Sequence, residues 1–101
     1  MSADLLNPHT RRYPVTHWQM LQFREALSDQ KNIRLHGTAE RGEIAISLPF
    51  GFGEVLLSYQ HGEGQLEVTL VASPKAVDEE IIWKNITQKI EQAQLACPRE
   101  I

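Results

Sequence analysis

The hydrophobic positions of the chain change their spacing along the sequence. Met20, Phe23 and Leu27 recur three to four positions apart, which is the spacing of one face of an α-helix. Thr16, followed three positions later by a glutamine, has the pattern of a capping box at the start of this stretch. The pattern therefore predicts an amphipathic helix over residues 16–29.

From residue 32 the apolar positions alternate with polar ones, which is typical of half-buried antiparallel strands. The alternating runs cover about residues 32–38, 43–49, 54–60 and 65–72. Because strands that follow one another in sequence usually pair, we expect a four-stranded antiparallel meander.

The register follows from the need to keep the apolar side chains on one face of the sheet. The pairs that we expect are Leu35 with Ile46, Leu48 with Val55, and Tyr59 with Leu66. This register leaves four-residue loops at 39–42, 50–53 and 61–64, each ending in a glycine that we expect in the left-handed conformation. We assign these glycines to turns rather than to a phosphate-binding loop, because no helix start follows them.

A stripe of isoleucines four positions apart predicts a second helix over about residues 78–96. Asp78 is a candidate N-cap for this helix. Ser73 followed by Pro74 offers an alternative start one turn earlier.

These elements predict an α+β fold, a two-layer α-β4-α sandwich with both helices on the apolar face of the sheet. Two helices about 10 Å wide match the width of four strands about 4.8 Å apart, so we expect them to cover that face. Trp18, Phe23 and Trp83 are then predicted to be core residues. The expected division is an extended arm at 1–14, one domain at 15–97 and a short tail at 98–101.

The predicted order of helix, strands and helix, with both helices on one sheet face, is similar to that of the frataxin family. The iron-linked role of that family rests on an acidic ridge along the first helix and the adjoining strand. Here the first helix carries only Glu25 and Asp29 as acids. The resemblance therefore concerns the arrangement of elements, and no functional residue is carried over.

The formal net charge is −3, and the cations are scattered apart from Arg11 and Arg12, which argues against nucleic acid or an anionic membrane as partner. Cys97, the single cysteine, excludes an intrachain disulfide, and its place at a helix end predicts an inert thiol. No secretory leader is visible in the sequence and no apolar run reaches about 18 residues, so we expect a cytoplasmic protein.

His36, Ser58 and Glu67 fall in one predicted cross-strand row, which raises the idea of a nucleophile, base and acid. The first two lie two strands apart, about 9.6 Å, which is too far for proton transfer. We expect Ser58 and Glu67 to share a surface hydrogen bond. The four histidines are spread over the chain, so the sequence predicts no catalytic residue, no metal site and no cofactor.

Three surfaces are candidates for interaction. The sheet face away from the helices carries short side chains at its centre, which suit either a solvated face or a flat docking surface. The strand at 65–72 is the edge that we expect to be less protected. Phe50 and Phe52 form the third: we expect Phe50 to cap the edge of the core, and the alternative is that both rings are exposed. The candidate interaction residues are Phe50, Phe52, Arg34, Ala45, Leu56 and Thr69.

These observations favour a non-enzymatic protein-interaction module, whose partner is another protein or a second copy bound at the open sheet face or an edge strand. The alternative is a small-ligand-binding domain or weak enzyme. That alternative predicts a pocket of more than about 300 Å³ between helices and sheet, near Trp18, Tyr59 and Trp83.

Overall fold

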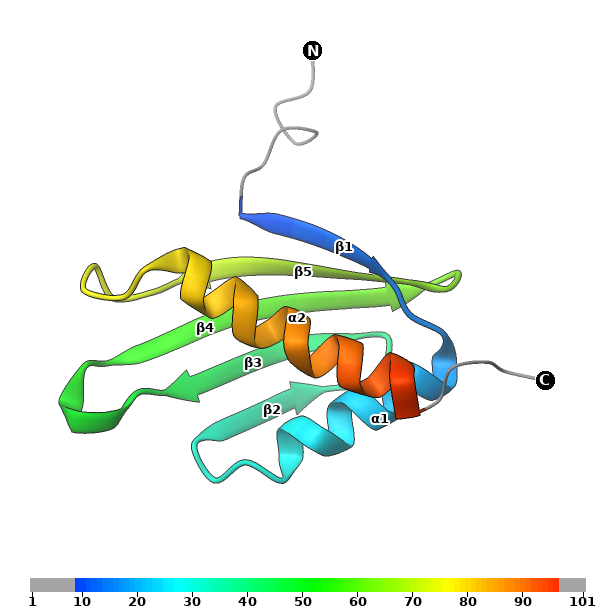
Figure 1. The fold of residues 1–101 in the computed structure, drawn as a ribbon, viewed down its shortest axis with the longest axis horizontal. Helices are drawn as coiled ribbons and strands as arrows, with labels where there is room; N and C mark the ends of the chain where they lie inside the picture. The colour runs from blue at the N-terminus through cyan, green and yellow to red at the C-terminus, as the bar shows by residue number, and fades with distance from the viewer. Residues whose placement is uncertain (1–8, 97–101) are drawn as a thin grey trace, which may run out of the picture.

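The computed structural model describes residues 9–96, and the predictions for residues 1–8 and 97–101, including an inert Cys97, lie outside that part. The elements in chain order are β1 (Thr10–Pro14), α1 (His17–Ser28), β2 (Ile33–Gly37), β3 (Arg41–Ser47), the short 3-10 turn η2 (Pro49–Gly51), β4 (Glu54–Gly62), β5 (Gln65–Ala72) and α2 (Glu79–Ala96). The strands form one antiparallel sheet in the order β1-β5-β4-β3-β2, and both helices lie on one of its faces (Figure 1).

Both helices begin at the predicted capping residues. The Gln19 N–H donates to Thr16 Oγ1 at 3.1 Å, and the Thr16 N–H donates to Gln19 Oε1 at 2.9 Å, which completes the capping box. At α2 the Glu80 N–H donates to Asp78 Oδ1 at 2.9 Å. The helix therefore starts after Asp78, and the alternative start at Ser73 is wrong.

The fifth strand, β1, was not predicted, and it corrects the expectation that the strand at 65–72 is an open edge. β1 pairs along β5, with Thr10 opposite Thr69, so the outer strands are β1 and β2. β1 was not predictable from the hydrophobic pattern, because its residues lack the apolar–polar alternation on which the strand predictions were based. Its inner face carries Arg11 and Tyr13, whose long side chains combine apolar stems with polar tips.

Contacts with α2 hold β1 at the edge of the sheet. The Arg11 guanidinium lies 4.8 Å from the centre of the Trp83 ring, a cation–π contact. Tyr13 Oη lies 2.9 Å from Thr87 Oγ1. Gln94 Nε2 donates to the Pro14 carbonyl at 2.7 Å. β1 is thus fixed by side chains as well as by its backbone pairing with β5.

The meander is present, but its register differs from the predicted one by two residues. Val55 lies opposite Ile46 rather than Leu48, and Leu35 lies opposite Ile44 rather than Ile46. Tyr59 lies opposite Val68 rather than Leu66, a shift of two residues in the opposite sense. A shift of two keeps every side chain on its expected face, because the side-chain period of a strand is two. The shift changes the loops: β4 and β5 meet in a two-residue turn at Glu63 and Gly64, both at positive φ.

The glycine prediction is correct only in part. Gly64 has φ 76°, as expected, and Gly53 is also at positive φ. Gly42 lies within β3, where a Cβ would collide with the His36 carbonyl and the Tyr59 ring. Glycine at that position therefore serves close packing rather than a left-handed turn.

The core lies between the helices and the sheet. Its buried side chains include Met20, Phe23 and Leu27 of α1, Trp83, Ile86 and Ile90 of α2, and Ile44, Val55, Leu57, Tyr59, Leu66, Val68 and Leu70 of the sheet. Phe23 and Trp83 are buried as predicted. Trp18 is half exposed, so its assignment to the core is wrong.

Candidate functional site

The helices do not cover the apolar face of the sheet evenly. α1 has 12 residues and α2 has 18, which correspond to lengths of about 18 and 27 Å. The two helices diverge from the start of α1 toward its end at Ser28 (Figure 1). As a result the apolar side chains of β2, of the end of β3 and of the residue directly after β3 are only partly buried, namely Ile33, Leu35, Ile46 and Leu48. The prediction that two helices cover this face is therefore wrong at the β2 side.

An apolar groove of about 230 Å³ lies where the helices diverge. Its apolar lining consists of Leu27, Ile33, Ile46, Leu48, Val55, Val77, Ile81, Ile82 and Ile86, and its polar lining of Gln30, Asn32, Asn85 and Lys89. The groove is smaller than the predicted pocket of more than 300 Å³ and differs from it in position, because neither Trp18, Tyr59 nor Trp83 lines it. Ile81, on the first turn of α2, is 57% exposed.

The connection between β3 and β4 projects an aromatic side chain beside this groove. Phe50 is 94% exposed and Phe52 is 55% exposed. The prediction that Phe50 caps the core is wrong, because both rings are exposed, and a contact of this pair with a partner stays a prediction. The loop is closed by two hydrogen bonds, from the Leu48 N–H to the Gly53 carbonyl at 2.9 Å and from the Phe52 N–H to the Pro49 carbonyl at 3.2 Å.

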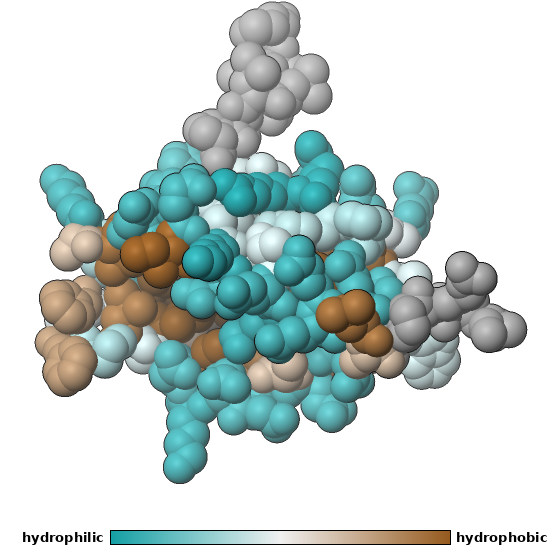
Figure 2. Space-filling model, in the orientation of Figure 1, coloured by the Kyte–Doolittle hydropathy of each residue, from teal (hydrophilic) through white to brown (hydrophobic). Residues whose placement is uncertain are grey.

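We call the groove together with Phe50 and Phe52 the apolar end. Figure 2 shows hydrophobic residues gathered at the left of the molecule, where the β3–β4 connection meets the start of α2. Much of the remaining surface in that view is hydrophilic, with an isolated hydrophobic patch toward the other end. Leu95, near the end of α2 and 79% exposed, is an exposed leucine outside the apolar end.

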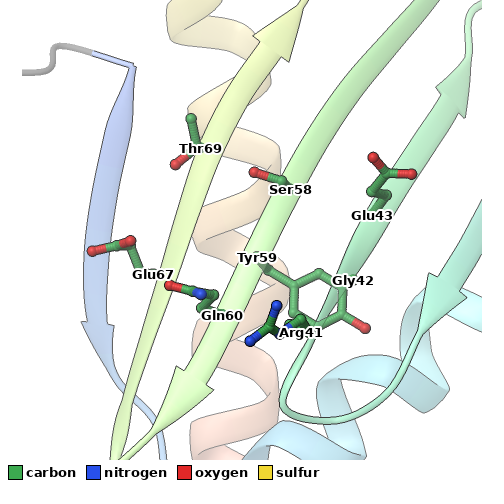
Figure 3. Close-up of a pocket in the computed structure, with 8 residues that line it drawn as sticks. All are labelled: Arg41, Gly42, Glu43, Ser58, Tyr59, Gln60, Glu67 and Thr69. Carbon is green, nitrogen blue, oxygen red and sulfur yellow. The ribbon is translucent and has the colours of Figure 1, made fainter.

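The opposite face of the sheet carries an open, polar hollow of about 330 Å³ (Figure 3). Ser58 lies opposite Thr69 on one side and Glu43 on the other, and Gln60 lies opposite Glu67. The Glu67 carboxylate accepts a hydrogen bond from Arg12 Nε at 2.8 Å. Ser58 and Glu67 were predicted to lie directly opposite each other, but they lie in neighbouring cross-strand pairs on this face. The prediction of a hydrogen bond between them is wrong, because the Glu67 carboxylate is paired with Arg12.

Polar side chains on this face pair with one another across the strands. Arg34 of β2 forms an ion pair with Glu54 of β4, and so reaches across β3. Ala45, the β3 residue opposite Arg34, is buried. Thr69 Oγ1 lies 2.9 Å from Thr10 Oγ1 of β1. Of the predicted interaction residues on this face, Leu56 is the exposed apolar one.

Within residues 9–96, no group of three or more histidine, cysteine, aspartate or glutamate side chains is placed to hold a metal ion. His36 lies opposite Glu43, whereas His61 is within the fold, with its Nε2 2.6 Å from the Val15 carbonyl. Because that carbonyl can only accept, the His61 Nε2 carries the proton and acts as a structural donor.

No protein-family model, curated protein or solved structure matches this chain. The strand β1 also precedes the first helix, so the element order departs from the helix-first order on which the likeness to frataxin was based. Within the described residues, neither helix is long and apolar enough to cross a membrane. The apolar end therefore has to be interpreted from its own chemistry.

Proposed function

We propose that the chain is a non-enzymatic protein-interaction module that binds its partner through the apolar end. The observation that carries the proposal is the 94% exposure of Phe50 on a hydrogen-bonded loop beside an apolar groove. Water contact with such a surface is unfavourable, and burial of an aromatic side chain removes about 150–250 Å² from solvent. Contiguous exposed apolar surface of this kind is typical of protein-binding sites.

The lining of the groove indicates the chemistry of the partner. Aliphatic side chains form most of its walls, so the partner inserts apolar side chains there. Lys89 is the one charged residue among those that line the groove, which favours an acidic residue beside the partner's apolar ones. An amphipathic segment with an apolar face and acidic flanks has this combination.

The open face of the sheet gives less support to a binding or catalytic role. Its ion pairs, Arg34 with Glu54 and Arg12 with Glu67, neutralise charged side chains across the strands. These charges therefore do not converge on one point, as they would in a catalytic or ligand-binding site. The alternative of a small-ligand site is less well supported, because the groove of about 230 Å³ is below the range of about 300–1,000 Å³ for ligand pockets. A cytoplasmic location, which the single cysteine favours, remains part of the proposal.

The test uses a fluorescein-labelled helical peptide with leucines on one face and glutamates on the flanks. We expect saturable binding to the wild-type chain, followed by fluorescence anisotropy. Ile81→Glu should weaken binding by about tenfold or more, because it places a negative charge in the groove, where it repels the glutamates of the peptide. Glutamate tolerates a helix well and Ile81 is exposed, so the fold should be retained, which circular dichroism checks.

Leu95→Glu is the matched control, because it makes a similar change on the same helix outside the apolar end. We expect this variant to bind the peptide like the wild type. Equal binding by all three proteins, or a loss only with Leu56→Glu on the open sheet face, would contradict the proposal.

A further inference from the structure

We infer that the partner at the apolar end is a second copy of this chain, and that two copies exchange their Phe50 side chains into each other's grooves. This inference rests on the proposed function and names the occupant of the same surface. It differs from the predicted homodimer, which used the open sheet face or an edge strand.

The first argument is size and chemistry. A cavity of about 150 Å³ lined by leucine, isoleucine and phenylalanine is known to hold a benzene molecule. The groove has about 230 Å³ and an aliphatic lining, so a benzyl side chain fits within it. Phe50, at 94% exposure, is such a side chain and contacts little of its own chain.

The second argument is the position of Phe50 relative to the groove. Leu48 lines the groove and precedes Phe50 by two residues, so the loop that carries the ring starts at the groove wall. In an interface with twofold symmetry, both subunits use the same surface patch, so every contact between the two subunits occurs twice. A projection beside a matching groove is self-complementary under that symmetry, and the assembly closes at two copies.

The third argument is the rigidity of the loop. Phe50 has φ 60°, a conformation that non-glycine residues rarely adopt, and the hydrogen bonds at Leu48 and Phe52 close the loop around it. Strained backbone of this kind is concentrated at functional sites. Because the backbone at Phe50 is already fixed, only the side-chain torsions lose freedom on binding, which favours association.

The strand edges are less suited to self-association. In β1, Pro14 has no N–H group and its carbonyl already accepts from Gln94. In β2, which has five residues, the Gly37 carbonyl accepts from Arg24 Nη2 at 3.2 Å. Each edge therefore has a carbonyl that is already occupied, which makes the addition of a second strand there less favourable.

Light scattering over a concentration series tests the inference. We expect the wild-type chain to form a dimer, and Phe50→Ser and Ile81→Lys each to raise the dimer dissociation constant by about tenfold or more. Leu95→Ser, the control for loss of an exposed apolar side chain, should remain within about twofold of the wild type.

A mixing experiment identifies the exchange. The Phe50→Ser chain keeps its groove and the Ile81→Lys chain keeps its phenyl ring, so a mixed pair retains one of the two contacts and each homodimer retains none. We expect the mixture to have a higher average mass than either variant alone. No such increase, or a dimer that both variants leave intact, would overturn the inference.

The peptide assay separates this inference from the proposed function. A wild-type chain that stays monomeric but binds the acidic amphipathic peptide would overturn the self-exchange and leave the interaction module in place. A monomer that binds no peptide would overturn both.

Discussion

The two sides of the helix-covered sheet face are built differently. At the β1–β5 side, side chains of α2 contact β1, and Leu66, Val68 and Trp83 are buried. At the β2–β3 side, α1 ends early and apolar side chains such as Ile33 and Ile46 remain partly exposed. One side thus forms a closed core and the other forms a groove.

The difference arises from how each side is covered. β1 supplies amphipathic side chains that contact α2, namely Arg11 over Trp83 and Tyr13 beside Thr87. The β2 side has the shorter helix, and the β3–β4 connection directs Phe50 to solvent instead of over the core. A protein of this size can keep such a groove open only if the closed side supplies most of its stability.

The largest expected effect comes from a matched pair of substitutions in β3. Ile44 is fully buried and Ile46 lines the groove, although both belong to the same strand and the same face. Ile44→Ala should reduce the free energy of unfolding by about 2–5 kcal/mol, as for other buried isoleucines. Ile46→Ala should cost about half as much, because its side chain is already partly in water.

Urea denaturation of both variants at low protein concentration measures this difference. Equal losses of stability would show that the groove side is as well packed as the core, contrary to the comparison.

An intermediate effect is expected from Tyr13→Phe on the closed side. The substitution removes the part-buried hydroxyl contact with Thr87, and we expect a loss of about 1 kcal/mol in thermal or urea unfolding. Arg12→Ala, on the solvent face of the same strand, removes an exposed ion pair with Glu67 and should cost about 0.5 kcal/mol. A larger effect for Arg12→Ala would mean that β1 is held by its outer face rather than by α2.

The smallest effect on stability is expected from Phe50→Asn. Asparagine adopts positive φ more readily than phenylalanine, so the variant should unfold with an unchanged or slightly higher free energy, by less than about 1 kcal/mol. The same variant should lose self-association. A clear loss of stability in the monomer would show that Phe50 supports the fold, which its exposure argues against.

The periodic parts of the fold were predictable from the sequence. The capping residues Thr16 and Asp78 and the alternation in the meander identified both helices and four strands, because these signals are local. β1 was missed because its order depends on β5 and α2, which are distant in sequence. The register was also missed, because a shift of two residues preserves the pattern of faces.

The candidate site shows the same limit. The exposure of Phe50 and Phe52 was predicted only as an alternative. The sequence pattern of a short loop does not determine whether its side chains turn toward the core or toward solvent. The groove was not predicted at all, because it results from the short reach of α1 over β2 and β3. The ion pair of Arg34 with Glu54 depends on the observed register, and the contact of Thr69 with Thr10 depends on β1. Neither pairing was therefore predictable.

Methyl NMR of isoleucine side chains, recorded at increasing protein concentration, tests the central claim most directly. The groove contains Ile33, Ile46, Ile81, Ile82 and Ile86, whereas Ile44 and Ile90 lie in the core but do not line the groove. The account predicts concentration-dependent shifts in the groove methyls, constant signals from the two core methyls, and no shifts at all in Phe50→Ser. Shifts confined to other residues, or groove signals that never change with concentration, would contradict it.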